Sequence, residues 1–303
     1  MGYGRMKTTR LTRREALEGY LFVAPLLLGL IFFTVGPVIA SLFISFCKYS
    51  IFGEPKFIGA QNYVKLSHDP LFWQSLKVTA IYSLVSVPLG LSLGLAVALL
   101  MNQKIRAIAL FRTIYYLPAV VSGVAVALLW VWIFDPSYGL GNVVLRGLGL
   151  PPLQWLSDTR TALPSLILMS LWGVGGGMVI YLAGLQSVPQ HLYEAAALDG
   201  ANLFQKFRHV TIPMLTPVIF YNLIMGIIGS FQVFTQAFVM TGGGPVNSTL
   251  FYVLYLFKQA FNYYHMGYAS AMAWLLFAII LALTLVVFKS SALWVYYEGE
   301  RRR

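Results

Sequence analysis

Charged residues are scarce in this sequence, and cysteine is almost absent from it. Acidic and basic side chains together make up 10% of the 303 residues, whereas 58% of the residues are hydrophobic. Soluble domains usually contain about 25% charged residues. A soluble fold of this length would still leave roughly a quarter of its chain surface in water, which is too much for so apolar a chain. The composition therefore predicts an integral membrane protein, and the mean hydropathy of +0.74 agrees with it.

Several kinds of site are excluded by what the sequence lacks. Cys47 is the only cysteine, so the chain can form no internal disulfide and no cysteine-rich metal site. The four histidines are scattered without metal-ligand spacing, and we expect no metal site. The chain has no GxxxxGK[ST] phosphate-binding loop. Its long apolar runs also contain no acidic residue, which a proton-driven carrier usually needs. If the protein moves a solute, the energy must come from another chain.

Six apolar segments are long enough to cross a bilayer as helices. Each contains about 20 or more residues without Asp, Glu, Lys or Arg. The prolines inside them are compatible with membrane helices, because neighbouring helices can re-satisfy the freed backbone carbonyl groups. We therefore expect an all-α, polytopic membrane protein with six transmembrane helices. The expected spans are residues 20–46, 78–101, 113–134, 162–186, 212–239 and 266–288.

The distribution of basic residues predicts the orientation of these spans. If both termini are cytoplasmic, 14 of the 21 Lys and Arg residues lie on the cytoplasmic side, as the positive-inside rule requires. The net charge of +11 then does not indicate a nucleic-acid partner, because most of the surplus Lys and Arg residues lie beside the spans. The expected parts of the chain are a cytoplasmic tail, 1–19, a single transmembrane permease domain, 20–289, and a second cytoplasmic tail, 290–303.

Residues 187–211 form the longest cytoplasmic loop, and they are patterned as two short helices. Ser187 is the expected N-cap of a first helix that has Pro189 in its first turn. Gly200 ends that helix, and Asn202 opens a second one that runs to Val210. The alanines of the first helix allow another protein surface to approach closely, and the acidic residues beside them favour a basic partner. An amphipathic linker lying on the lipid headgroups is the alternative.

The same loop carries a recognisable signature. Glu194-Ala195-Ala196, three residues, Gly200, nine residues and Val210-Thr-Ile-Pro213 resemble the EAA motif of ABC importer permeases. The family has Ile-x-Leu-Pro at the last four positions, so Val210 and Ile212 are conservative departures. In that family the loop is a coupling helix that sits in a cleft of the ATPase subunit. The resemblance thus implies ATPase coupling by Glu194, Ala195, Ala196, Ala197, Asp199, Gly200 and Pro213.

Three further stretches are similar to one branch of that family, the maltose, lactose and glycerol-phosphate type of carbohydrate permease. They are Leu21-Phe-Val-Ala-Pro25 with the following Pro37 and Ser45-Phe46, Phe57-Ile-Gly-Ala-Gln-Asn-Tyr63, and Thr241-Gly-Gly-Gly-Pro245-Val-Asn-Ser-Thr249. The resemblance implies a maltose-type permease fold in the bacterial cytoplasmic (inner) membrane. The partners it implies are a second homologous permease, an ATPase dimer that binds ATP and Mg²⁺, and a periplasmic or lipid-anchored solute-binding protein. No cofactor is expected in this chain itself.

The fifth span is rich in the neutral groups that bind sugars. Gln232 and Gln236 are four residues apart, which would place both amides on one helix face. Two amides in lipid are costly unless they line a cavity or pair with a neighbour. Pairing between two permease subunits is the alternative to a cavity. The candidate substrate-binding residues of this span are Asn222, Phe231, Gln232, Phe234 and Gln236.

In the fourth span, Trp172 is followed by four glycines within five positions. At about 1 kcal/mol each, these glycines would destabilise a regular helix by several kcal/mol. They allow either close helix packing or an unwound segment that lines a pocket near the middle of the membrane. In the second case Trp172 would stack on a sugar ring, and Gly176 and Gly177 would form an open wall.

Together these features predict the permease subunit of an ATP-driven importer for a sugar, an oligosaccharide or a sugar-like polyol. Three alternatives remain at this point. The chain could be an importer permease for a non-sugar solute, a stand-alone secondary transporter or channel, or a membrane enzyme. An enzyme would need catalytic polar groups clustered at one depth, and the sequence indicates no such cluster.

Overall fold

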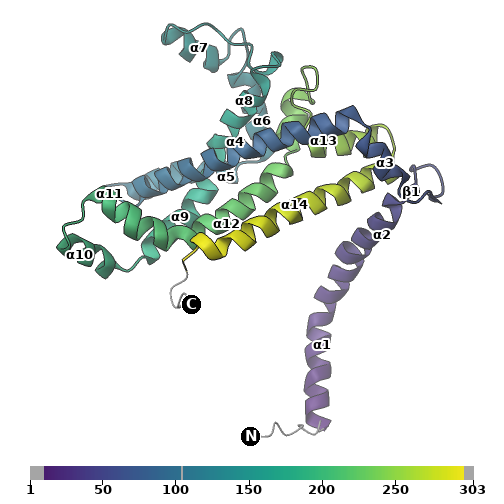
Figure 1. The fold of residues 1–303 in the computed structure, drawn as a ribbon, viewed down its shortest axis with the longest axis horizontal. Coiled ribbons are helices and arrows are strands. Elements are labelled where there is room, and N and C mark those ends of the chain that lie inside the picture. Colours follow the sequence, from purple (N-terminus) through teal and green to yellow (C-terminus); the bar gives the residue numbers. More distant parts are fainter. Residues whose placement is uncertain (1–9, 104, 297–303) are drawn as a thin grey trace.

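The computed structural model describes residues 10–103 and 105–296, and nearly all of these residues are helical (Figure 1). The outer parts of both predicted tails, 1–9 and 297–303, lie outside the described residues together with Lys104. The α-helices are α1 Arg10–Leu30, α2 Gly36–Ser45, α3 Gln61–Ser67, α4 Pro70–Met101, α5 Ile108–Val120, α6 Gly123–Ile133, α7 Leu140–Gly147, α8 Ala162–Ser170, α9 Gly175–Ser187, α10 Gln190–Leu198, α11 Leu203–Lys206, α12 Ile212–Phe231, α13 Tyr252–Phe257 and α14 Met266–Trp294.

Four helices of the described chain are individually long and apolar enough to cross a membrane. They are Arg13–Ser45, Pro70–Met101, Leu203–Phe231 and Met266–Trp294. Two further pairs pass the same test only as bent pairs, α5 with α6 and α8 with α9. The number of candidate spans is therefore four, or up to six if each bent pair crosses once.

The predicted third span, 113–134, is wrong as a single helix. It is divided into α5 and α6, which meet at an angle of 98°. Val121, between them, has an extended backbone, and Ser122-Gly123 follows it. Sharp bends of this kind form at Gly/Ser pairs because both residues accept non-helical backbone. The predicted fourth span is bent by 44° where a short 3₁₀ turn, Leu171–Gly173, separates α8 from α9.

The centre of the molecule is a bundle in which α4 packs against α9, α12 and α13, and α14 packs against α12 and α2. Small residues let these helices approach closely. A Cβ atom on Gly184 of α9 would meet Val218 of α12 at 2.7 Å, and one on Gly226 of α12 would meet Val87 of α4 at 3.2 Å. Glycine at these two positions therefore fixes how α12 sits between its neighbours.

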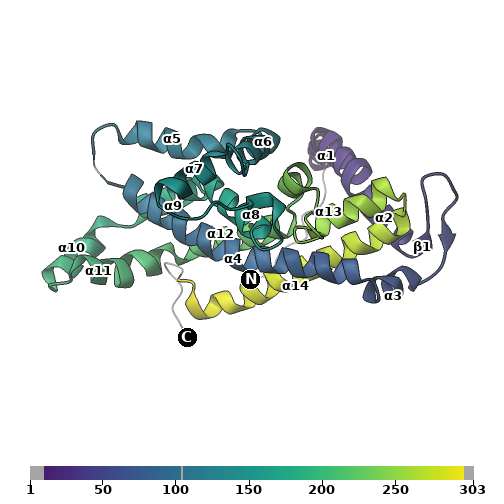
Figure 2. The ribbon, with the colours of Figure 1, turned by 90° about the horizontal axis from the view of Figure 1, so that it is seen from above.

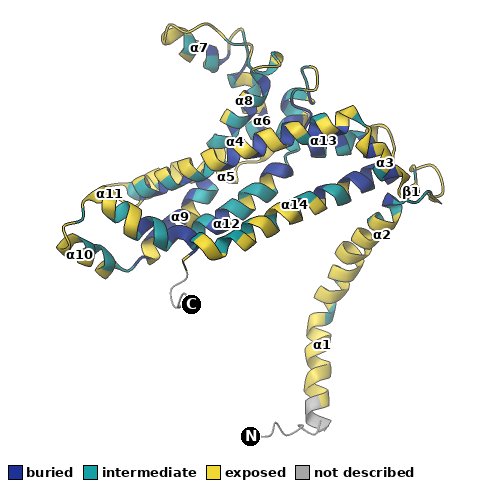
Figure 3. Ribbon diagram, viewed as in Figure 1, coloured by how far each residue is buried: buried dark blue, intermediate teal, exposed yellow. Residues whose placement is uncertain are grey.

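The first predicted span lies apart from this bundle. The helix from Arg13 to Ser45 leaves the other helices at an angle, and none of its most apolar window is buried by the chain (Figures 1 and 3). Only α2, at its far end, contacts α14, where the Trp274 Nε1–H donates to Ser41 Oγ at 3.1 Å. Most of α1 therefore needs lipid or another chain around it.

Helices α10 and α11 lie at one end of the bundle, and a short hairpin with α3 lies at the other (Figures 1 and 2). The hairpin joins β1, Cys47–Lys48, to β2, Lys56–Phe57, in antiparallel register, with Lys48 opposite Lys56. Asp69 then caps α4, since its Oδ1 accepts a hydrogen bond from the Leu71 N–H at 2.9 Å.

Asp69 also ties together three separate helices at this end. Its Oδ2 accepts hydrogen bonds from the hydroxyls of Tyr255 and Tyr268, which belong to α13 and α14. Burial alone would raise the pKa of Asp69, but these hydroxyl bonds and the backbone N–H groups hold the pKa below its ordinary value. The stabilisation is therefore present at neutral pH and is lost as the pH falls through the lowered pKa.

We predict that Asp69→Ala lowers the free energy of unfolding by about 2–4 kcal/mol, because two partly buried hydroxyls lose their acceptor and α4 loses its N-cap. Denaturation in detergent micelles at neutral pH would measure the change. Glu54→Ala is the control, since Glu54 is an exposed carboxylate in the hairpin at the same end. Equal stability of the two variants would contradict the proposed role of Asp69.

Candidate functional sites: an internal cavity and a docking loop

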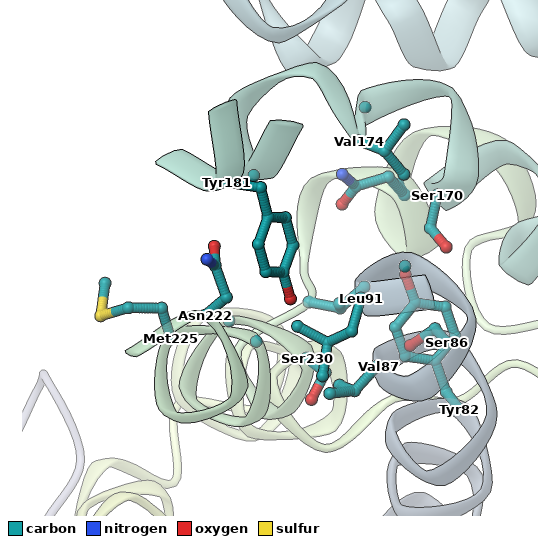
Figure 4. A pocket seen from close by; sticks show the side chains of 17 residues that line it. Tyr82, Ser86, Val87, Leu91, Ser170, Val174, Tyr181, Asn222, Met225 and Ser230 are labelled. Carbon is teal, nitrogen blue, oxygen red and sulfur yellow. The ribbon is translucent and has the colours of Figure 1, made fainter. Parts of the chain in front are cut away.

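A cavity of about 430 Å³ lies inside the bundle between α4, α12 and the bend that joins α8 to α9 (Figure 4). Among the described residues, no Asp, Glu, Lys or Arg side chain lines it. The polar groups on its wall are neutral hydroxyls and amides, and Tyr181 extends from α9 into the space between α12 and α4 (Figure 4). These polar residues are Tyr82, Ser86, Ser170, Tyr181, Asn222, Ser230 and Gln236.

A second, smaller cavity of about 130 Å³ adjoins the first. The two share Ser170, Gly173 and Gln236 in their walls. Trp172 and Val121 line the smaller cavity, so it reaches the break between α5 and α6. The two cavities form one region whose walls are mostly apolar and carry several neutral polar groups.

The interruptions of the helices converge on this region. The bend at Gly173, the break at Val121 and the non-helical residues after α12 all contribute to the walls. Backbone that leaves the helix inside a membrane is tolerated where it is buried in protein or lines a cavity. The three interruptions of the helices thus lie where the chain forms the walls of the two cavities.

Four of the predicted substrate-binding residues line the cavities, namely Trp172, Gly177, Asn222 and Gln236. The Asn222 Nδ2–H donates to the Val218 carbonyl one turn earlier at 2.9 Å. Its Oδ1 points toward Gly177, since a Cβ atom there would lie 3.5 Å from it. The side-chain amide oxygen of Asn222 can therefore accept a hydrogen bond from a solute in the space that Gly177 leaves open.

The other four predicted residues lie outside the cavities. The prediction that Gln232 and Gln236 share one helix face is wrong. Helix α12 ends at Phe231, and residues 232–234 are not helical, so Gln232 is exposed elsewhere. Phe231 is buried in the core, while Phe234 stacks on Phe238 at a centroid distance of 5.3 Å. This packing within an aromatic cluster overrides the helical pattern of the sequence. Gly176 faces Ala119 of α5 instead of the cavity.

Both interpretations of the glycine-rich segment apply, at different glycines. A Cβ atom on Gly175 would collide with the Tyr115 carbonyl oxygen of α5, so this glycine serves close packing. Gly173 and Gly177, on either side of it, line the larger cavity. The second interpretation applies only in part, because the segment is bent by 44° at a 3₁₀ turn but not unwound, and Gly175, Gly176 and Gly177 lie within α9.

Sequence reasoning missed the two tyrosines of the cavity and the serines near them. Tyr82 and Ser86 are four residues apart on α4, which is the spacing that would have indicated a shared face. The Ser83 hydroxyl, on the same helix, hydrogen-bonds the Ser230 hydroxyl of α12 at 2.7 Å. The signal was weak because these residues lie within an otherwise apolar span.

The predicted docking loop forms two helices that project from the end of the bundle. Gly200 ends α10 with a left-handed backbone (φ +78°), as predicted. Asn202 opens α11 through a capping box with Gln205. The N-cap of α10 is Pro189, however, so the prediction of Ser187 is wrong, and Ser187 is the last residue of α9.

The second short helix does not stop at Val210. Residues Leu203–Phe231 form one continuous helix, with a π-helical turn at Phe207–Thr211 just before Pro213. A proline removes one backbone donor, and the wider turn absorbs that loss without a break. The Tyr193 hydroxyl bonds the Thr211 hydroxyl at 3.0 Å, which holds α10 against this helix. One continuous helix therefore connects the loop to the wall of the cavity.

The tip of the loop exposes large apolar side chains that the prediction did not include. Leu198 is 91% exposed, Leu203 86% and Phe204 67%. Ala195 and Ala197 lie exposed on the same short helix as Leu198. Exposed apolar groups gathered at a protruding tip are typical of a surface that contacts a protein or a membrane. Their place on either side of Gly200 in a polar loop could have identified them from the sequence.

These features define a polytopic membrane protein with an uncharged cavity among its helices and a two-helix loop that projects from one end. The family described as "Binding-protein-dependent transport system inner membrane component" matches residues 86–297. The chain is 45% identical to the probable ABC transporter permease protein YesP of Bacillus subtilis, over 99% of this chain and 98% of that one. It is 37% identical to the trehalose/maltose transport system permease protein MalF of Thermococcus litoralis, over 93% and 96% of the two chains.

The chain therefore belongs to the binding-protein-dependent permeases of ABC importers. It is a multi-pass component of the inner membrane. Its fold is also similar to that of a chain in the crystal structure of a bacterial alginate ABC transporter in complex with an alginate pentasaccharide-bound periplasmic protein. The TM-score is 0.83 at 24% identity, over 94% of this chain and 97% of that one.

We predict that Gly175→Ala destabilises the protein by about 1–3 kcal/mol, because the new methyl group meets the backbone of α5 with no side chain able to move aside. Gly176→Ala is the matched control, since its Cβ atom would meet only Ala119 Cβ at 3.9 Å. Thermal unfolding of both variants in detergent would measure the difference. Equal melting temperatures would show that the contact between α5 and α9 does not depend on Gly175.

Proposed function

We propose that this chain is the subunit that carries a sugar, an oligosaccharide or a sugar-like polyol through the membrane in an ATP-driven importer. The observation that carries the proposal is the continuous helix Leu203–Phe231. One end of it bears the exposed docking loop, and the other end bears Asn222 and Ser230 in the cavity wall. A force applied to the loop is thus transmitted along one rigid element to the place where a solute would bind.

The chemistry of the cavity supports a neutral polyhydroxyl solute. Sugars are bound by amides and hydroxyls that match their own hydroxyl groups and by aromatic rings that stack on their apolar faces. The wall offers the amides of Asn222 and Gln236, the phenols of Tyr82 and Tyr181, and the indole of Trp172 in the adjoining space. The trehalose/maltose permease of Thermococcus litoralis, a relative over most of the chain, supports the same class of solute.

The proposed topology has six spans with both termini in the cytoplasm. The bent pairs α5–α6 and α8–α9 each cross once in this arrangement, and α10 and α11 lie on the cytoplasmic side. The basic residues support this orientation through the positive-inside rule. The transmembrane domain then covers 20–289, with short cytoplasmic tails at 1–19 and 290–303.

The partners that we propose are a second homologous permease, an ATPase dimer and a periplasmic or lipid-anchored solute-binding protein. ATP and Mg²⁺ bind to the ATPase, and this chain holds no cofactor. The alanine face of α10 and the apolar tip from Leu198 to Phe204 occupy a cleft of the ATPase. The first span, which this chain leaves uncovered, provides a surface for the second permease.

The proposed mechanism is alternating access. Closure of the ATPase dimer on ATP pulls α10, and the bond between Tyr193 and Thr211 passes the movement to the helix that lines the cavity. The bundle then opens outward and receives the solute from the binding protein. Hydrolysis reverses the movement and opens the cavity inward.

The two rival functions find less support. A stand-alone carrier would not need an apolar tip projecting from the end of the bundle. A membrane hydrolase would need an exposed nucleophile, and the one Gly-x-Ser-x-Gly sequence of the chain, residues 90–94, lies in the middle of the continuous helix α4. A nucleophile elbow requires a sharp strand-to-helix turn.

We predict that Leu198→Asp reduces co-purification of the ATPase by tenfold or more, because it places a charge in an apolar contact. Gly200→Asp has the same effect, because a side chain is strained at φ +78°. Leu150→Asp is the control, since Leu150 is an exposed leucine in the loop after α7. Affinity purification of the co-expressed subunits measures the outcome. Full co-purification with both loop variants would rule out the docking role.

We also predict that Gln236→Leu raises the KM for uptake about tenfold, since one hydrogen bond to the solute is lost. Gln232→Leu is the matched control and leaves the KM unchanged, because Gln232 lies outside the cavity. Uptake by the complex in proteoliposomes measures both. A raised KM for Gln232→Leu with an unchanged KM for Gln236→Leu would contradict this prediction and would mean that the solute contacts Gln232.

A further inference from the structure

A third cavity lies at the end of the bundle opposite the docking loop, apart from the two adjoining cavities described above. Its volume is about 460 Å³, and it is bounded by the hairpin β1–β2, by α3 and by the start of α14. The side chains on its wall include Lys48, Lys65 and His265, together with the amide of Gln61. No acidic residue from the described part of the chain contributes to the wall. The function proposed above makes no use of this cavity.

Basic side chains outnumber acidic ones around this cavity. Lys48 stands directly opposite Lys56 in the hairpin, and like charges in that position repel each other. The hairpin also carries the exposed Glu54, and the carboxylate of Asp69 accepts a hydrogen bond from the hydroxyl of Tyr268, whose side chain lines the cavity. Among the described residues neither carboxylate lines the cavity, and neither Lys48 nor Lys56 forms an ion pair closer than 4 Å.

His265 lies at the edge of the same cavity. Burial lowers its pKa, and the charge of Lys65 lowers it further, so the ring is neutral at pH 7. The His265 Nδ1 is hydrogen-bonded to the Gln259 side-chain oxygen at 3.0 Å, which fixes the ring there. Lys65 lies over the ring of Tyr268 at 5.0 Å and is thereby oriented at the same edge. An anion in the cavity would be attracted by the charges of Lys48 and Lys65.

The depth of the cavity identifies which anion can reach it. Lys48 lies three residues after the end of α2, and His265 directly precedes the first residue of α14. Lys65 lies in α3, one turn before α4 begins at Pro70. Three membrane helices thus end or begin around the cavity, which puts it at the level of the lipid headgroups and not above the membrane.

Aromatic side chains around the cavity indicate the same depth. Phe52 packs edge-on against Tyr264 at 5.5 Å, and both are exposed. Phe57 and Tyr263 are exposed beside them, at 69% and 55%. Aromatic rings are enriched at the membrane–water interface, where one side of the ring is wet and the other apolar. Below the cavity, α2 exposes Ile39 and Phe43, against which an acyl chain can lie.

From these contacts we propose that the cavity binds the phosphate of an anionic phospholipid in the outer leaflet. Lys48 and Lys65 bind the phosphate oxygens, and the Gln61 amide contacts the rest of the headgroup. The bound lipid reduces the repulsion across the hairpin, at the place where β1 and α3 pack against the start of α14. The site does not depend on which solute the protein transports.

The experiment is a titration of the purified full-length chain with phosphatidylglycerol and with phosphatidylcholine of the same acyl chains, followed by native mass spectrometry. We expect phosphatidylglycerol to bind at least tenfold more tightly than phosphatidylcholine. The double variant Lys48→Gln, Lys65→Gln reduces that preference to twofold or less. The double variant Lys48→Arg, Lys65→Arg keeps it, which separates loss of charge from loss of fold.

The matched control is Lys77→Gln, Arg160→Gln. It removes two exposed positive charges that do not line the cavity, so the net charge changes equally. This control keeps the preference for phosphatidylglycerol if the proposal is correct. Equal binding of both lipids by the unaltered chain overturns the proposal, and so does an equal loss in the control. Retained lipid preference in the glutamine variant, with lost binding of a solute-binding protein, would instead make the cavity a protein docking site.

Discussion

The structure depends on the absence of water inside the bilayer. Every backbone amide and carbonyl there must find a partner within the protein, and a helix provides these partners within one segment. The described chain departs from the helix at membrane depth at Val121, at Leu171–Gly173 and at residues 232–234. All three departures lie around the same uncharged cavity. The chain thus concentrates its irregular backbone where a polar solute and its water can satisfy it.

A second consequence of helical continuity is the connection between the docking loop and the cavity. Pro213 and Pro217 both lie in the helix Leu203–Phe231, yet neither breaks it. The π-helical turn before Pro213 takes up the missing hydrogen bond, and Gly184 and Gly226 let the helix lie close to α9 and α4. Stiffness along the helix and close packing across it together make it suited to carry a movement over its full length.

The helical class, the apolar segments and the two helices of the loop 187–211 were predicted well, because these depend on local patterns. Hydropathy indicated each segment, and Gly200 and Asn202 have the backbone roles that their chemistry requires. Some errors are local: the N-cap of α10 lies two residues after Ser187, and the helix continues past Val210 through a π-helical turn. Others occur where contacts between distant segments decide the structure. Gln232 leaves the helix because Phe234 packs into an aromatic cluster with residues further along the chain. The tyrosines of the cavity likewise depend on neighbours that a single sequence does not identify.

The isolated position of the first helix has a consequence for how the protein is held in the membrane. Its contacts with the bundle lie mainly in α2, so its direction is set by how α2 packs on α14, and lipid or a neighbouring chain acts on α1. A thinner or thicker bilayer would therefore change the lipid contacts of α1 while leaving the cavity walls in place.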